Sequence, residues 1–209
     1  MMLAEQSYQT RSHKLTVEEY LELEEKSEIR HEFYNGGMYA MAGGTINHNQ
    51  LTQRVANLLE SQLSLDKWGV FSENMKVDVQ EGRHMPYPDV LVTCHPFDLR
   101  GNNLIIRQPR LLIEVLSKST AHKDRGDKWR DHRKMPSLWY YMLVDQYTTT
   151  VELFSRIEET DEWINTIYES PDDVIVLPRL TCELSVGAIY EGVEFVPTDD
   201  DIPPNEKQE

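Results

Sequence analysis

The chain has 209 residues, a formal net charge of −15 at pH 7, and 39% apolar against 27% charged residues. This composition is typical of a folded domain with a sizeable core, and the negative charge excludes a protein that coats nucleic acid by charge alone. No apolar run approaches the roughly 18 residues of a membrane span, and the N-terminus lacks the apolar segment of a secretion signal, so we expect no membrane partner and a cytoplasmic location.

The N-terminal part of the chain predicts a short helix followed by a hairpin. Residues 1–14 are mostly polar and are expected to be flexible. Thr16 and Glu19 form a capping box, which favours a helix that ends near Lys26. Next, the run Asn35-Gly36-Gly37 lies between two alternating apolar segments, a pattern typical of a β-hairpin.

The middle of the chain predicts a long helix and several buried strands. Thr45 follows two glycines and could cap a helix over 46–65, in which apolar residues recur at helical spacing. Three runs of strand character follow, and the last two show the continuous Val, Leu and Ile content of strands buried on both faces. These runs are 69–79, 87–93 and 110–116. A polar helix is then expected over 119–135, with Ser119 or Thr120 as its N-cap.

The C-terminal part predicts more sheet. Residues 138–145 read as another buried strand, and three amphipathic runs suit an antiparallel extension. These runs are 149–154, 163–168 and 174–177. A short closing helix is expected over 184–190, and residues 196–209 have the composition of a disordered acidic tail. The whole predicts one α/β domain over residues 15–195, with a mixed central sheet flanked by helices and a β-rich C-terminal extension.

Positive charge is gathered in one stretch of this acidic chain. Residues 100–134 contain ten Lys or Arg against four Asp or Glu, a local charge of +6. The remainder has 11 basic and 32 acidic residues, which gives −21. The stretch is either a local patch that binds phosphates or a solvated helix whose charges are paired.

Two carboxylates interrupt apolar strand runs. Asp89 stands in YPDVLV and Glu114 in RLLIEVLS. Because burying an unpaired carboxylate is costly, each needs a reason to be there. On neighbouring strands, the two acids could converge and hold a hard divalent cation, Mg²⁺ or Mn²⁺. The alternative is that each acid pairs with a nearby arginine or caps a backbone group.

The helix expected after the Glu114 strand carries a candidate catalytic lysine. Asp124, Lys128 and Asp131 are spaced by four and three residues, so they share one helical face. An ammonium that reaches over the strand end could orient an attacking water and stabilise negative charge on a phosphate. The alternative is a surface ion pair between Lys128 and Asp124.

A resemblance to a known family is carried by YPDVLV and by PRLLIEVLSKSTAHKDRGDKWRDHRKMPSLWYYMLVD. These segments resemble the bacterial Uma-two family of restriction-endonuclease-like proteins, within the PD-(D/E)xK nuclease superfamily. The resemblance covers roughly residues 16–192, and EFYNG and AGGTINH also fit it. It implies a restriction endonuclease-like fold and Mg²⁺- or Mn²⁺-dependent hydrolysis of phosphodiester bonds in DNA.

The resemblance also implies roles for individual residues. Asp89 matches the PD acid and Glu114 the second metal ligand, with the backbone carbonyl of Val115 as a further ligand. The superfamily usually places its lysine two residues after the second acid, where this chain has Leu116. The resemblance therefore points to Lys128, on the following helix, as the migrated catalytic lysine.

Several further residues are candidates for the same site. Glu32 could complete a second metal position or hold a metal-bound water, or it could pair with Arg30. His48 could face the same cleft, or it could make an ordinary hydrogen bond at the start of its helix. A group of basic residues could hold the flanking phosphates. These residues are Lys118, Lys123, Arg125, Arg130 and Arg133.

Two functions from different classes therefore stay open. The first is an endonuclease that cleaves DNA, with a structured or single-stranded nucleic acid as the alternative substrate. It is expected to be a homodimer because many nucleases of the superfamily are dimers. The second is a catalytically silent nuclease fold that serves as a binding or assembly module, favoured by the missing E-x-K lysine and the net charge. A Ser or Cys hydrolase is disfavoured, since the chain has no G-x-S-x-G and no suitable Cys-His pair. Cys94 and Cys182 are far apart and are interpreted as inert thiols in a reducing compartment.

Overall fold

The computed structural model of the chain describes residues 14–41 and 43–195. The expected flexible N-terminus (1–14) and disordered tail (196–209) fall, apart from Lys14, outside the described residues. Within the part of the chain that is described, no helix is both long and apolar enough to cross a bilayer.

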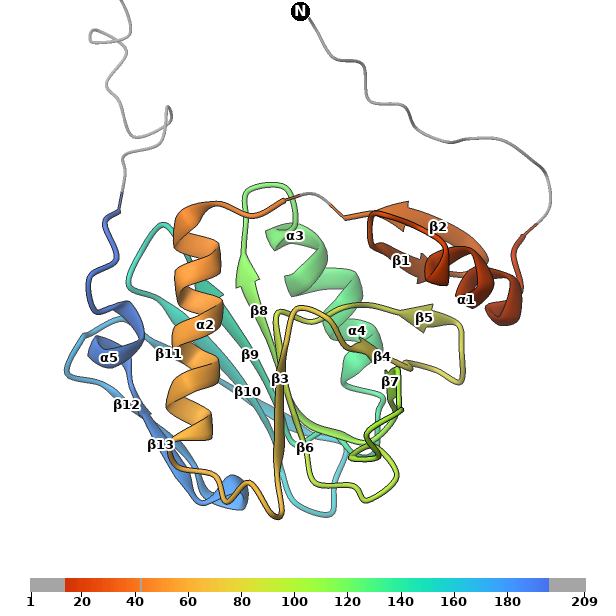
Figure 1. Ribbon diagram of the computed structural model, residues 1–209. Coiled ribbons are helices and arrows are strands. Elements are labelled where there is room, and N and C mark those ends of the chain that lie inside the picture. The colour runs from red at the N-terminus through yellow and green to blue at the C-terminus, as the bar shows by residue number, and fades with distance from the viewer. Residues whose placement is uncertain (1–13, 42, 196–209) are drawn as a thin grey trace, which may run out of the picture.

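A six-stranded sheet forms the centre of the molecule (Figure 1). Its strands are β3 (Gly69–Ser72), β6 (Val90–Thr93), β8 (Pro109–Leu116), β9 (Tyr140–Asp145), β10 (Val151–Arg156) and β11 (Trp163–Tyr168). They lie in the spatial order β11-β10-β9-β8-β6-β3. Strands β8 and β9 are parallel, and the other neighbouring pairs are antiparallel. The predicted α/β class with a mixed central sheet is confirmed.

One face of the sheet is covered by α2 (Ile46–Glu60), which Thr45 caps by accepting the N–H of His48 at 3.1 Å. The apolar stripe of α2 packs into the larger core together with α5 (Val186–Tyr190) and the hairpin of β12 (Val174–Leu177) and β13 (Cys182–Ser185). The 3₁₀ turn η2 (Pro178–Leu180) joins these two strands.

The end of α2 differs from the expected 46–65. The helix stops at Glu60, because the hydroxyl of Ser61 donates to the carbonyl of Leu58 and the chain then turns through Ser64. Hydroxyl side chains compete for backbone groups in this way at helix ends.

The opposite face of the sheet is covered by one continuous helical segment over residues 121–132 (Figure 1). It consists of α3 (Ala121–Lys123), the π-helical turn η1 (Asp124–Lys128) and α4 (Trp129–His132). A second apolar cluster lies between this segment and the sheet. Glu114 is the carboxylate within β8 that faces this side, on the same face of the strand as Leu112 and Leu116.

The helix expected over 119–135 is shorter and differs in its middle, whereas the expected N-cap position at Thr120 is confirmed. The middle of the segment is a π-turn, a widened form that is rare and occurs mostly near functional sites. Thr120 stands at the N-cap but its side chain makes no capping bond. Instead the hydroxyl of Ser117, four residues before the first helical residue, accepts the N–H of Thr120 at 3.2 Å.

The predicted strands over 69–79 and 87–93 are also shorter than expected. At Glu73 the backbone takes φ 59°, and the chain leaves the sheet before β4 (Lys76–Val77), which pairs in parallel with β7 (Ile105–Ile106). The second strand begins at Val90, since Pro88 has no N–H for a ladder and Asp89 uses its side chain to accept a backbone N–H of β8.

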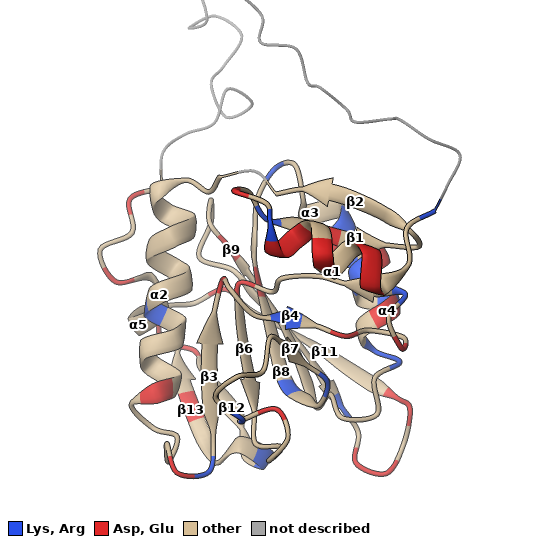
Figure 2. Cartoon of the chain, turned by 45° about the vertical axis from the view of Figure 1, so that its right-hand side comes forward, with Lys and Arg blue, Asp and Glu red and all other residues tan. Residues whose placement is uncertain are grey.

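A smaller layer stands at the edge of the molecule. It contains α1 (Val17–Glu25), which has the predicted Thr16 capping box, and a three-stranded sheet in the order β2-β1-β5. Its strands are β1 (His31–Tyr34), β2 (Gly37–Ala40) and β5 (His84–Met85). The predicted hairpin is confirmed, with positive φ at Asn35 and Gly36. Acidic residues colour much of α1 red in Figure 2.

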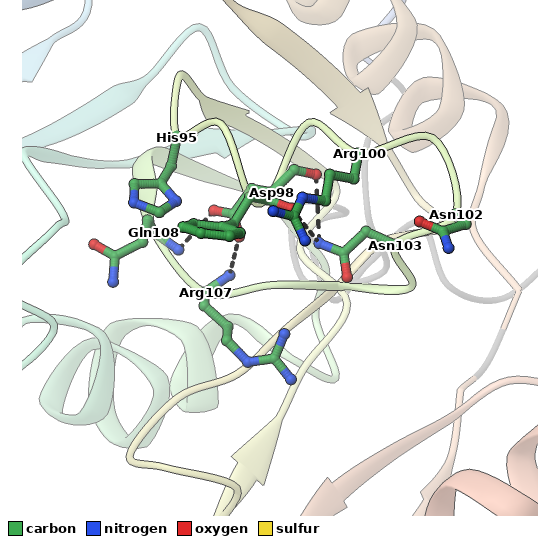
Figure 3. Close-up of a pocket in the computed structure, with 8 residues that line it drawn as sticks. His95, Asp98, Arg100, Asn102, Asn103, Arg107 and Gln108 are labelled. Carbon is green, nitrogen blue, oxygen red and sulfur yellow. Dashed lines mark hydrogen bonds between the residues drawn. The ribbon is translucent and has the colours of Figure 1, made fainter.

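The loop between β6 and β8 is long and encloses a cavity, drawn in Figure 3. The buried carboxylate of Asp98 holds this loop together. Its oxygens accept the backbone N–H of Arg107 at 3.0 Å and of Gln108 at 2.8 Å. This loop stands at one end of β6 and β8, and the candidate active site stands at the other.

Candidate active site

Two carboxylates lie at the same end of adjacent strands. Asp89 directly precedes β6, and Glu114 lies near the end of β8. The antiparallel register pairs Val90 with Ile113, so that Asp89 stands opposite Glu114 one step further along. Residues directly opposite in an antiparallel pair point to the same face. The fold thus brings the two acids together at this end of the sheet.

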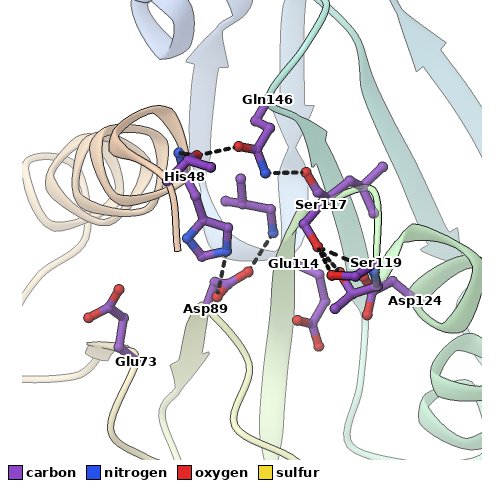
Figure 4. A network of polar contacts seen from close by, with 12 residues as sticks. His48, Glu73, Asp89, Glu114, Ser117, Ser119, Asp124 and Gln146 are labelled. Atoms are coloured by element: carbon purple, nitrogen blue, oxygen red, sulfur yellow. Dashed lines mark hydrogen bonds and ion pairs between the residues drawn. The ribbon is translucent and has the colours of Figure 1, made fainter. Parts of the chain in front are cut away.

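Both carboxylate oxygens of Asp89 are held by the protein. Oδ2 accepts the backbone N–H of Val115 at 2.6 Å, and Oδ1 lies 3.3 Å from Nε2 of His48 (Figure 4). Burial alone would lower the pKa of His48, but its hydrogen bond and charge interaction with Asp89 raise it above the ordinary value. The orientation of Asp89 is therefore fixed by one backbone group and one imidazole.

Glu114 is a buried carboxylate among other acids. Burial raises its pKa well above the ordinary value; Lys128 opposes this shift, while Asp124 and Asp89 add to it. Figure 4 shows the side chains of Asp89, Glu114 and Asp124 next to one another at the end of the sheet. A carboxylate in this position needs positive charge nearby to remain ionised.

Lys128 supplies that charge. Its Nζ lies 3.1 Å from Glu114 Oε1, 3.2 Å from Glu32 Oε1 and 3.2 Å from Asp124 Oδ1. The side chain is only 12% exposed, so it does not point into solvent. Burial alone would lower the pKa of Lys128, but Glu114, Glu32 and Asp124 raise it well above the ordinary value. The lysine is therefore a fixed ammonium directed at the acids.

The charge balance of this cluster fits a hard divalent cation. Three carboxylates (Glu32, Glu114 and Asp124) contact one ammonium, and Asp89 lies near Glu114; carboxylate oxygens are donors that Mg²⁺ and Mn²⁺ prefer. Among the described residues, no three His, Cys, Asp or Glu side chains group so that they alone could hold a metal ion. The expected metal ligands (Asp89, Glu114 and the backbone carbonyl of Val115) include only two such side chains.

The remaining candidates occupy different positions. Glu32 comes from β1 of the smaller layer and reaches Lys128, not Arg30. Arg125 pairs with Glu152 Oε1 at 2.7 Å and lies 3.9 Å from Asp145, so acids already neutralise part of its charge. Lys123 is exposed on α3.

The other basic residues of the stretch are also spread out. The backbone N–H of Lys118, just after β8, donates to the hydroxyl of Tyr147 at 3.4 Å. Arg130 pairs on the surface with Asp127 at 2.7 Å, and Arg133 is exposed. The basic stretch thus combines paired charges with cations that face the solvent.

Two further buried residues, His132 and Gln146, lie beside the site, and no sequence pattern predicted them. His132 is fully buried with its ring nitrogens unbonded in the described structure, 4.0 Å from Glu114 Oε1 and stacked on His84. Gln146, also buried, donates to the carbonyl of Leu116 at 2.7 Å and contacts the hydroxyl of Thr45. Gln146 therefore ties the start of α2, which carries His48, to the end of β8.

The fold is shared with a protein of known structure. A crystal structure from Anabaena variabilis, described as a putative nuclease belonging to DUF820, superimposes with a TM-score of 0.69. The superposition covers 84% of this chain and 97% of that one at 18% sequence identity. The architecture is therefore shared although few side chains are.

The chain belongs to the Uma2 (Uma-two) family, whose sequence model, described as "Putative restriction endonuclease", matches residues 17–188. The resemblance inferred from the motifs is confirmed. Two uncharacterized proteins of Synechocystis sp. are similar to it along most of their length. Protein slr1290 is 34% identical over 87% of this chain and 94% of its own, and sll1609 is 32% identical over 73% and 86%.

Proposed function

We propose that this chain is a metal-dependent endonuclease that hydrolyses phosphodiester bonds in DNA, with Asp89, Glu114 and Lys128 as its catalytic residues. The contact of Lys128 Nζ with Glu114 Oε1 at 3.1 Å carries the proposal, because it directs a buried ammonium at Glu114 from the helical segment after β8. The residue two positions after Glu114 is Leu116, so Lys128 takes the part of the missing lysine.

The metal would be held by Asp89, Glu114 and the backbone carbonyl of Val115, as Mg²⁺ or Mn²⁺. When bound, such an ion lowers the pKa of a water molecule and polarises a phosphate oxygen. Glu32 would complete a second metal position or hold a water molecule. His48 and the Val115 N–H keep the Asp89 carboxylate in one orientation. Lys128 orients the attacking water and balances the negative charge that develops on the phosphate.

DNA is the proposed partner, with Lys118, Lys123 and Arg125 as contacts to the flanking phosphates. Such contacts position a strand without reading its sequence. The net charge of −15 opposes tight binding by a single copy. We therefore expect a homodimer, in which two basic stretches act together, and a cytoplasmic location. Sedimentation of the full chain with and without DNA measures the first expectation.

A catalytically silent binding module is the second candidate. It is favoured by the three carboxylates around Lys128, since an ammonium neutralised by its neighbours can serve as a structural ion pair. The two candidates differ in whether the acids bind a divalent cation and whether DNA is cut.

Cleavage of plasmid and oligonucleotide DNA in Mg²⁺ or Mn²⁺ tests the proposal. Wild type is compared with Asp89→Asn, Lys128→Gln and the matched control Asp127→Asn, whose carboxylate pairs with Arg130 at the surface of the same segment. We expect cleavage by wild type and the control, and a loss of about 100-fold or more in the other two variants. Thermal unfolding of each variant separates loss of activity from loss of fold.

Metal binding provides the second readout. Calorimetry with Mn²⁺ is expected to give heat with wild type and none with Asp89→Asn. Binding of metal without cleavage of any DNA form would favour the silent module. The absence of both metal binding and DNA cleavage would refute the nuclease. Equal cleavage by wild type and Lys128→Gln would refute the role of the lysine alone.

A further inference from the structure

A second site of different character lies about 20 Å from the acids. The cavity in the loop between β6 and β8 has a volume of about 490 Å³ (Figure 3). Glu114 lies six steps of nearly extended chain after Gln108, which is in the cavity lining, and each step adds about 3.3 Å. The cavity therefore shares no residue with the candidate active site.

The lining of this cavity is positively charged in an acidic protein. The lining residues include two arginines, Arg100 and Arg107, and a single acidic residue, Asp98. Asp98 is buried and turned into the loop, where it accepts two backbone N–H groups and the hydroxyl of Thr93. Its charge is thus used to hold the loop, which leaves the two arginines as the remaining charged residues of the lining.

Both arginines remain accessible. The Arg100 guanidinium lies 4.2 Å above the ring of Phe97 and has no carboxylate partner among the residues that the structure describes. Arg107 Nε lies 3.6 Å from Asp78 Oδ2, a long ion pair, and its side chain is 56% exposed. A planar guanidinium supported on an aromatic ring keeps its fork of donors free for an anion.

Neutral polar groups complete the lining. His95 Nδ1 is buried and has no hydrogen-bond partner within the described residues. The amides of Asn102 and Gln108 also line the cavity. A buried polar atom without a partner is costly, and a ligand that bonds to it would remove that cost.

We propose that this cavity binds a phosphorylated ligand of nucleotide size, with Arg100 and Arg107 on the phosphate and His95 and Gln108 on the remainder. Its volume lies in the range of small-molecule sites and exceeds what one inorganic phosphate fills. Arginine is the side chain best suited to bind phosphate through two parallel hydrogen bonds. The ligand is either a free nucleotide or a nucleotide unit of a strand. The proposal does not depend on nuclease activity.

Calorimetric titration of the full chain in EDTA tests this site without any contribution from metal. The probes are inorganic phosphate, deoxyadenosine monophosphate and a short 5′-phosphorylated single-stranded oligonucleotide. We expect Arg100→Gln and Arg107→Gln to weaken binding about tenfold or more each. Arg83→Gln, in the exposed turn before β5, removes the same charge elsewhere and should keep the wild-type affinity.

The outcomes are distinct. Binding of the mononucleotide identifies a free nucleotide as the ligand, and binding of the oligonucleotide alone identifies a strand; both support the site. The absence of binding for every probe would overturn it, and so would inorganic phosphate that binds as tightly as the nucleotide, or equal losses in all three variants. The same titration with Asp89→Asn should be unchanged, so a failure of cleavage leaves this result standing.

Discussion

Glu114, which we propose as a metal ligand, is expected to destabilise the metal-free fold. Burial and the neighbouring acids raise its pKa well above the ordinary value, because the cluster holds more carboxylates than ammonium groups. We predict that Glu114→Gln stabilises the metal-free protein by about 1–2 kcal/mol, since it relieves uncompensated charge. Mg²⁺ should raise the melting temperature of wild type and leave that of Glu114→Gln unchanged.

Thermal unfolding in EDTA and in Mg²⁺ measures both effects, with the surface substitution Asp127→Asn as control. A lower melting temperature for Glu114→Gln in EDTA would contradict the prediction. It would mean that the charge of Glu114 is needed to neutralise Lys128, and Glu32 and Asp124 do not suffice.

The stacked pair of His84 and His132 predicts a pH dependence of stability. Burial lowers the pKa of both imidazoles, and their proximity to each other and to Lys128 lowers that of His132 further. Near and below pH 6.5, the two imidazoles therefore bind more protons in the unfolded chain than in the folded chain. Stability should be fully present above the unfolded pKa of about 6.5 and should fall as pH drops below it.

Urea unfolding of wild type and His132→Phe between pH 7.5 and 5 measures this effect. The phenylalanine keeps the ring packing against Tyr141 and cannot be protonated, so the variant should lose less stability on acidification. His122→Phe, at an exposed position of α3, should follow the wild-type curve. Parallel curves for wild type and His132→Phe would refute the prediction.

The π-turn η1 is the element that sets the direction of Lys128. Gly126 stands inside this turn, its φ is not positive, and an added Cβ would meet no atom within 4 Å. Gly126→Ala should therefore stabilise the protein by about 0.4–1 kcal/mol by restricting the unfolded chain. Chemical denaturation gives the magnitude, and cleavage gives the effect on the site.

A loss of stability in Gly126→Ala would mean that the widened turn depends on glycine. Unchanged stability together with weaker cleavage would mean that the substitution moves Lys128. Gly101→Ala, in the loop before β7, is a control because its Cβ would also be free of contacts.

How far the elements could be predicted depends on the range of the interactions that define them. The long helix and the central strands follow from local apolar periodicity, and Asp89 and Glu114 were found because they interrupt it. The π-turn could not be read from DRGDK, since it depends on how the segment packs on the sheet. Gln146 and His132 gave no signal, because their partners are 30 or more residues away or belong to another layer.

At the scale of the whole molecule, the basic residues gathered in 100–134 should make DNA binding weaken as salt rises, although the net charge is −15. The proposed phosphate contacts Lys118, Lys123 and Arg125 would release about three counterions, so the slope of log K against log salt should be about −3 per copy. Anisotropy with labelled DNA between 50 and 200 mM NaCl measures it, with the cleavage-deficient Asp89→Asn variant in EDTA.

A dimer that engages two stretches should double that slope. Lys123→Gln should make it shallower by about one unit, since one cation fewer displaces counterions. Affinity that does not change with salt would contradict this account of binding.

The bond between Asp89 Oδ2 and the N–H of Val115 has a consequence for redesign. The donor is a peptide group, which every residue except proline supplies. Position 115 can therefore be varied, by selection or by computation, to change the packing of the core, while its hydrogen bond to the Asp89 carboxylate is kept. A single substitution, Val115→Pro, would remove this hydrogen bond without changing either acid.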